Sequence, residues 1–306
     1  KTGQEIHQFS FKLLQKPDKR NPRDSFNQTK IKNKNSRDLD ELNIIMVKYI
    51  INLIISPLTK LINLSIKHAF FPQCLKYSKV LPVHKKNSGD SYSNYRPISI
   101  IPTLSKILEK LLHKQLTEFA YSKDLLCSSQ FGFRTKRSTT LAIQELITYI
   151  SEGFEEKMYI GVAFCDLSRA FDCVDHNLLL SKLIEIGITD QSLTLLESYL
   201  LDRYQVTVYN SATSTPCKIA YGVPQGSILG PLLFLIYVNN LPADVDVKMI
   251  LYADDTTLLL KDDEPNKLVD RLNSAQTKVA DWFLKNGLFL NKDKTASMIF
   301  STKTIT

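Results

Sequence analysis

At residues 249–260 the chain reads Met249-Ile250-Leu251-Tyr252-Ala253-Asp254-Asp255-Thr256-Thr257-Leu258-Leu259-Leu260, with two adjacent acids between two apolar runs. Such runs favour strands, and Asp-Asp is an acceptable pair for a tight turn. The stretch therefore predicts a β-hairpin with the carboxylates of Asp254 and Asp255 at its tip. Adjacent like charges repel, so this placement favours a hard divalent cation, which prefers oxygen ligands. A solvated turn is the alternative interpretation.

A third acid upstream strengthens the metal interpretation. Residues 159–166 read Tyr-Ile-Gly-Val-Ala-Phe-Cys-Asp, an apolar strand that ends on the carboxylate of Asp166. The nearby Asp172, Asp175 and His176 are typical turn and helix-cap residues. Strands and helices are mixed along the chain and the acid-bearing hairpin is antiparallel, so the predicted class is α+β.

The composition is that of a soluble globular protein of 306 residues, with 43% hydrophobic and 23% charged residues. The net charge of +8 favours a polyanionic partner. The five cysteines form no Cys-x-x-Cys pair, which predicts reduced thiols and an intracellular protein, in the nucleus or the cytoplasm. The most apolar early run, 44–56, contains Lys48 and Asn52 and is too short to cross a bilayer, so no membrane partner is expected.

Hydrophobic periodicity places most of the remaining elements. It predicts one helix that Pro57 ends, a second from Leu58 to Ala69, and an amphipathic helix over 103–120. Ser138 is expected to cap a further helix that ends near Phe154. The last helix is predicted from Leu268 to Phe283, followed by two final strands over 288–290 and 297–300.

Three segments carry candidate binding residues. Lys85 and Lys86 end a short strand and Arg96 begins the next, so these cations can clamp a triphosphate, although exposed basic hairpins are common. The loop Gly222-Val223-Pro224-Gln225-Gly226-Ser227 precedes an all-apolar helix and lets a ligand approach the backbone closely. In Gln130-Phe131-Gly132-Phe133-Arg134 the arginine can bind a nucleic-acid backbone. Both aromatic rings are interpreted as core residues, with stacking on a base as the alternative.

Six motifs in this order resemble the reverse transcriptase domain of non-LTR retrotransposons, of the long-interspersed and jockey-like kind. They are Asn94-Tyr95-Arg96-Pro97-Ile98-Ser99, Gln130-Phe131-Gly132-Phe133-Arg134, Phe164-Cys165-Asp166-Leu167-Ser168-Arg169-Ala170-Phe171-Asp172, Gly222-Val223-Pro224-Gln225-Gly226-Ser227, Tyr252-Ala253-Asp254-Asp255 and Asn286-Gly287-Leu288-Phe289-Leu290-Asn291. The resemblance runs from about Leu42 to Phe300. It implies a right-hand polymerase fold whose palm is a small antiparallel sheet backed by helices, with the thumb largely missing.

With this resemblance the chain is expected to comprise four consecutive segments. They are a polar, basic lead-in over residues 1–40, a helical support over 41–78, the fingers over 79–158 and the palm over 159–306. The implied activity is RNA-directed DNA synthesis, in which dNTPs are added to the 3′-OH of a DNA primer on an RNA template. The RNA that is copied and the oligomeric state are left open.

The resemblance also implies roles for single residues. Nucleotidyl transfer uses two Mg²⁺ ions roughly 3.5–4 Å apart, with Mn²⁺ left open as the better metal. Asp166 and Asp254 would bridge both ions, Asp255 would be a lesser ligand, and the carbonyl of Leu167 would complete one shell. Arg96, with Lys85 or Lys86, would hold the triphosphate, and Phe171 would lie under the sugar. Gln225 would contact the incoming nucleotide, and Gly226 would let the template strand come close. Lys294 would act as a general acid that protonates the leaving pyrophosphate.

Two alternatives stand beside this interpretation. The first is a catalytically silent nucleic-acid-binding remnant, against which the retained acids argue. The second is an intron-encoded or telomerase-like reverse transcriptase, which the Asn-Tyr-Arg-Pro-Ile-Ser stretch at residues 94–99 makes less favourable.

Overall fold

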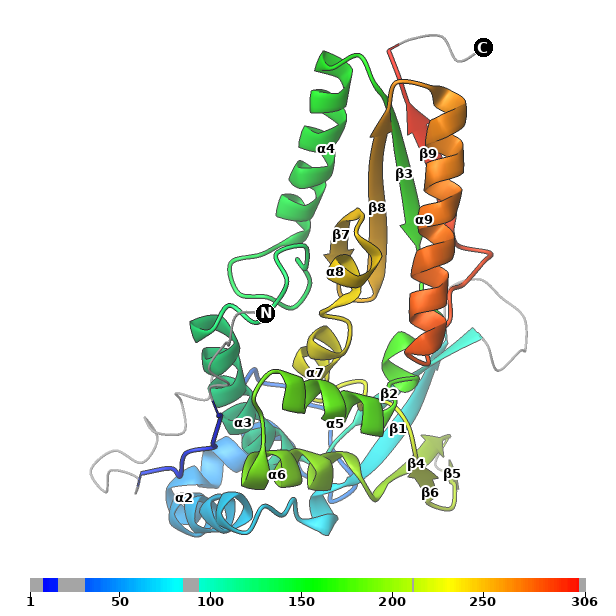
Figure 1. Ribbon diagram of the computed structural model, residues 1–306. Helices are drawn as coiled ribbons and strands as arrows, with labels where there is room; N and C mark the ends of the chain where they lie inside the picture. The colour runs from blue at the N-terminus through cyan, green and yellow to red at the C-terminus, as the bar shows by residue number, and fades with distance from the viewer. Residues whose placement is uncertain (1–7, 16–30, 85–93, 211, 303–306) are drawn as a thin grey trace. The chain divides into compact units, whose positions relative to one another are not determined.

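The structure is a computed structural model that describes residues 8–15, 31–84, 94–210 and 212–302 (Figure 1). The chain forms two compact units, each built from two stretches: Lys1–Lys123 with Leu179–Leu232, and Asp124–Leu178 with Leu233–Thr306. We call them unit 1 and unit 2. The units are discontinuous in sequence, unlike the consecutive segments expected above, because each sheet takes strands from both of its unit's stretches. The division into fingers and palm stays a prediction.

Unit 1 contains a sheet with the order β2-β1-β4-β5, in which β6 also pairs with β4. Its strands are β1 (Tyr77–His84), β2 (Tyr95–Ile100), β4 (Arg203–Tyr209), β5 (Ala212–Thr213) and β6 (Cys217–Ile219). The antiparallel pair β1 and β2 confirms the predicted basic hairpin, whereas β1 and β4 are parallel. Lys85 and Lys86 lie outside the described residues.

The helices of unit 1 are α2 (Ile44–Lys67), α3 (Thr103–Ser122) and α6 (Asp190–Leu200), with a short 3-10 turn, η1 (Gln73–Leu75). The predicted break at Pro57 is wrong, because α2 continues through the proline. A proline inside a helix costs about 3 kcal/mol. Buried Ile55 and Ile62 flank it, and burial of each such side chain stabilises by about 1.5–3 kcal/mol, which offsets that cost.

Much of the α2 surface is apolar and exposed, with Tyr49 at 83% and Leu53 at 81% exposure. Among the described residues, α2 is long and apolar enough to cross a membrane, and 22% of its most apolar window is buried. The expectation that this run is too short to cross a bilayer was wrong, because the helix continues past residue 56 to Lys67. A single helix of this kind is weak evidence of a membrane span. The absence of a membrane partner stays a prediction.

Unit 2 contains an antiparallel sheet with the order β7-β8-β3-β9. Its strands are β3 (Tyr159–Cys165), β7 (Lys248–Tyr252), β8 (Asp255–Asp262) and β9 (Ala296–Phe300). The predicted hairpin is confirmed: Tyr252 pairs with Asp255, so Ala253 and Asp254 form the turn. Residues 288–290 were wrongly predicted as a strand. Leu290 makes only an isolated bridge, because the chain turns at once at Asn291.

Helices cover both faces of the unit 2 sheet. They are α4 (Thr139–Glu155), α9 (Pro265–Lys285) and the short α8 (Leu241–Val245). A side chain at Gly161 would contact α9 at Leu268, and Ile160 packs under Gly153 of α4. Successive residues of a strand point to opposite faces, so α4 and α9 lie on opposite sides of β3, as Figure 1 shows. The fold is therefore of mixed α and β class, as predicted.

The chain passes between the units at three points: after α3, at Lys123–Asp124, and within the helices α5 (His176–Glu185) and α7 (Gly230–Tyr237). As predicted, α7 is apolar and buried on nearly all sides. The side chain of Asp175 accepts a hydrogen bond from the Leu178 amide, which confirms its cap role. All five cysteines are free thiols, as expected.

Candidate active site

The three acids lie at one end of the unit 2 sheet. Asp166 follows the last residue of β3, Asp254 is in the β7–β8 turn and Asp255 begins β8. β3 and β8 are antiparallel neighbours whose last register pair is Cys165 with Thr256. One step further along this register brings Asp166 opposite Asp255. The sequence predicted the strand ends, and the pairing of β3 with β8 brings the acids together.

The carboxylates influence one another electrostatically. Burial raises the pKa of Asp254, and the charges of Asp255 and Asp166 raise it further. Burial is also the largest cause of the raised pKa of Asp255, followed by the charge of Asp166. Lys294 lowers the pKa of both groups. The site therefore concentrates negative charge that a cation would stabilise.

Lys294 already supplies one positive charge. Its Nζ donates a hydrogen bond to Oδ2 of Asp166 over 3.0 Å, across 128 positions of sequence. The lysine side chain is 68% exposed, whereas that of Asp166 is 26% exposed. The turn after Asn291 holds the lysine here, since the amides of Lys294 and Thr295 both donate to the Asn291 carbonyl.

The donor set suits a hard cation in its chemistry, because carboxylate oxygens are the ligands that Mg²⁺ prefers. Leu167 and Leu290 form an isolated antiparallel bridge, in which the Asp166 carbonyl accepts from the Asn291 amide and the Ser168 amide donates to the Phe289 carbonyl. The Leu167 carbonyl takes no part in this bridge. Within the described ranges, however, no three His, Cys, Asp or Glu side chains gather closely enough to hold a metal ion. The acids therefore fit the ion in kind and charge, but they are not gathered around one position, and the ammonium group of Lys294 is paired with Asp166.

Phe171 lies in the short turn η3 (Ala170–Asp172) that follows the first acid. Its ring stacks on buried Phe234 at 4.5 Å between centroids and meets Phe133 edge-on at 6.2 Å. Phe171 is thus held by packing on both sides, although its role toward a sugar stays a prediction.

The basic-aromatic segment at 130–134 meets its predictions only in part. Phe131 is a core residue, as expected, but Phe133 is 59% exposed, so its assignment to the core was wrong. The guanidinium of Arg134 donates to the carbonyls of Leu126 and Cys127 within its own loop. This internal bonding orders the loop.

The other predicted nucleotide-binding residues belong to unit 1. Arg96 is an exposed residue of β2. The carbonyl of Gln225 accepts a hydrogen bond from the Ser99 amide at 3.2 Å. Gly226 has a φ of +116°, and a Cβ there would lie 2.4 Å from the Ser99 carbonyl oxygen. Gly226 thus packs closely against β2, and its approach to a template strand stays a prediction.

Sequence reasoning missed Glu109, which anchors the end of the same loop. This residue of α3 is fully buried, and its Oε2 accepts from the amides of Ile228 and Leu229 at 2.7 and 3.3 Å. Its Oε1 accepts from the Ser105 hydroxyl at 3.0 Å. Burial raises the pKa of Glu109, and the charge of Arg203 opposes that rise. The available signal was helical spacing, because Ser105 and Glu109 share the face of Leu112.

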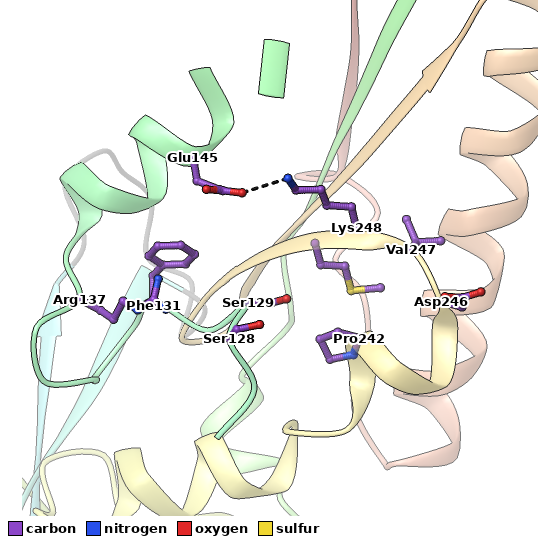
Figure 2. Close-up of a pocket in the computed structure, with 10 residues that line it drawn as sticks. Ser128, Ser129, Phe131, Arg137, Glu145, Pro242, Asp246, Val247 and Lys248 are labelled. Atoms are coloured by element: carbon purple, nitrogen blue, oxygen red, sulfur yellow. Dashed lines mark ion pairs between the residues drawn. The ribbon is translucent and has the colours of Figure 1, made fainter. Parts of the chain in front are cut away.

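A pocket of about 530 Å³ lies within unit 2. Figure 2 shows the residues that line it, which lie near β7 and the start of α4. Glu145 and Lys248 form an ion pair at 3.0 Å across it. Arg137 lies over the Phe131 ring at 4.7 Å. None of the residues predicted for the active site is among those that line it, so the candidate site stays with the acids.

Comparison with known proteins identifies the family of this chain. Residues 83–305 match the family described as reverse transcriptase (RNA-dependent DNA polymerase). The chain is 35% identical over 253 residues to the probable RNA-directed DNA polymerase from transposon BS of Drosophila melanogaster, covering 79% of this chain and 28% of that protein. It is 29% identical over 248 residues to the RNA-directed DNA polymerase from mobile element jockey of the same species, covering 77% and 26%.

A third relative is the putative 115 kDa protein in the type-1 retrotransposable element R1DM of Drosophila melanogaster. It is 27% identical over 274 residues, which cover 88% of this chain and 26% of that protein. The chain thus spans little more than a quarter of the length of these curated relatives. The predicted resemblance to non-LTR retrotransposon enzymes is confirmed, and the chain belongs to the reverse transcriptase (RNA-dependent DNA polymerase) family.

Proposed function

We propose that this chain is the catalytic part of an RNA-directed DNA polymerase of a non-LTR retrotransposon. In this proposal it adds dNTPs to a primer 3′-OH on an RNA template. The observation that carries the proposal is the juxtaposition of Asp166, Asp254 and Asp255 at adjacent strand ends, in a chain that matches the family over residues 83–305. The antiparallel sheet of unit 2, backed by α4 and α9, is the palm in this scheme.

Reverse transcriptases generally use divalent metal ions. Here Asp166 and Asp254 would hold two Mg²⁺ ions, with Asp255 and the Leu167 carbonyl as further ligands. When bound, such ions stabilise the charges on the attacking and leaving oxygens. Lys294, already at the acids, would give a proton to the leaving pyrophosphate. Arg96, Gln225 and Gly226 stay predicted nucleotide-binding residues.

The test is primer extension by this chain on an RNA template, with dNTPs and Mg²⁺. We expect extension that stops when a chelator removes the metal and returns when Mg²⁺ or Mn²⁺ is added back. A chain that binds the template in a salt-sensitive way but extends no primer would contradict the proposal. That result would identify the nucleic-acid-binding remnant instead.

The Phe171→Val variant is expected to incorporate rNTPs about tenfold more readily relative to dNTPs. Removing several ring carbons beside a ribose 2′-OH relaxes a steric exclusion worth about 1–3 kcal/mol. The measurement is the ratio of kcat/KM for a dNTP and the matching rNTP. Because Phe171 also stacks on Phe234, thermal unfolding must accompany the assay. A folded variant with the wild-type sugar ratio would remove Phe171 from this role.

A further inference from the structure

Gln130 lies directly behind the turn that carries Asp254. Its side chain is buried, with the residue only 2% exposed. Its Oε1 accepts hydrogen bonds from the amides of Gly132 and Ala253 at 2.8 and 3.0 Å. Its Nε2 donates to the carbonyl of Ala253 at 3.4 Å. One glutamine amide therefore binds both polar backbone groups of the residue that precedes the acid.

The backbone that Gln130 holds is unusual. Ala253 has a φ of +59°, a left-handed conformation that residues with a Cβ adopt at a cost. Such a residue needs surrounding contacts to keep it in place. The side-chain amide of Gln130 provides two such contacts, to the amide and to the carbonyl of Ala253. These backbone groups set the direction in which the chain enters Asp254.

The segment around Gln130 is itself fixed to the hairpin. The Phe131 amide donates to the Leu251 carbonyl at 2.7 Å, and the Leu251 amide donates to the Ser129 carbonyl at 2.8 Å. Figure 2 shows Ser129 and Phe131 of this segment near the strand that carries Lys248. A Cβ on Gly132 would lie 2.2 Å from the Ala253 nitrogen, so only glycine permits this approach. The segment thus places the glutamine against the turn with little freedom.

We infer that Gln130 is a positioning residue for the metal-binding acids, because it holds the left-handed Ala253 and thereby orients Asp254. This inference rests on the proposed function. Groups that orient metal ligands typically change metal affinity or activity by about 10–100-fold when they are removed. A residue that served only the fold would change stability without a selective effect on metal binding.

The test compares the wild-type chain with Gln130→Met and Gln130→Asn. Methionine removes both hydrogen-bonding groups at similar length, and asparagine keeps an amide that is one carbon too short to reach Ala253. We expect the apparent Kd for Mn²⁺, measured by its effect on thermal unfolding, to rise about tenfold or more. We also expect kcat for extension to fall about 10–100-fold, with the KM for dNTP within about twofold.

Gln115 provides a matched control in unit 1. Its Oε1 accepts from the Lys12 amide at 2.7 Å, and its Nε2 donates to the Lys12 carbonyl at 3.1 Å. Gln115→Met therefore loses the same two kinds of hydrogen bond, to the amide and the carbonyl of one residue, at a less buried position far in sequence from the acids. It is expected to keep the Mn²⁺ affinity and kcat of the wild type.

The outcomes separate the two proposals. A folded Gln130→Met or Gln130→Asn protein with wild-type Mn²⁺ affinity and kcat would overturn the positioning role. If methionine prevents folding, the asparagine variant decides. A wild-type chain that shows neither extension nor a Mn²⁺-dependent shift in unfolding would overturn the proposed function, independently of the variants.

Discussion

The Asp254→Asn variant is expected to lose primer extension by a factor of about 1,000 or more while keeping its fold. A metal ion supplies several kcal/mol of transition-state charge stabilisation, and about 4 kcal/mol corresponds to that factor. The asparagine side chain has nearly the same shape but carries no charge, so the turn between β7 and β8 should persist. Asp166→Asn is expected to cause a loss of similar size.

The same substitution should also stabilise the metal-free protein at pH 7. Burial and the neighbouring acids raise the folded-state pKa of Asp254 above its ordinary value of 3.8. A carboxyl group with a raised folded pKa favours folding below its unfolded pKa, and this contribution is lost as the pH rises through the folded pKa. At pH 7 the wild type therefore holds an unfavourable charge that asparagine removes.

Thermal unfolding with a chelator present checks this, together with circular dichroism and the extension assay. Asp263, just beyond the far end of β8, offers an exposed control on the same sheet, and Asp263→Asn should leave extension unchanged. An unfolded Asp254→Asn protein would make Asp254 a structural residue. An active one would remove it from catalysis.

The Gly226→Ala variant is expected to destabilise unit 1 by about 2–4 kcal/mol. The φ of +116° at this position is unfavourable for any residue with a Cβ and costs about 1–3 kcal/mol. The added methyl would also lie 2.4 Å from the Ser99 carbonyl oxygen, so β2 or the loop must move. Because Gln225 is adjacent, extension should fall as well.

Urea or thermal unfolding measures the effect, and Gly287→Ala is the control. Gly287 has a φ of +67°, but a Cβ there would lie 3.8 Å from the nearest atom, an ordinary contact. This control therefore carries only the cost of a left-handed backbone, about 1 kcal/mol, and no steric clash. Equal destabilisation of the two variants would show that β2 yields to the methyl at no cost.

Local sequence patterns predicted most of the elements correctly. Apolar runs around Asp-Asp identified the hairpin, and Ser138 caps α4 by accepting from the Leu141 amide. The errors occurred where packing overrides local preference. Helix α2 passes through Pro57 because buried residues on both sides hold it, and residues 288–290 lack the sustained partner that a strand needs.

The sequence alone specified the acids, the strand ends that carry them and the family motifs, because these depend on neighbouring residues and on short spacings. Only the tertiary structure revealed that Lys294 reaches Asp166, that Gln130 binds the backbone of Ala253, and that Glu109 caps the loop after Gly226. The partners in these contacts are more than 100 positions apart. Which distant polar groups meet is decided by how the sheets and helices pack, and at Gln130 and Glu109 the buried side-chain groups must find partners there.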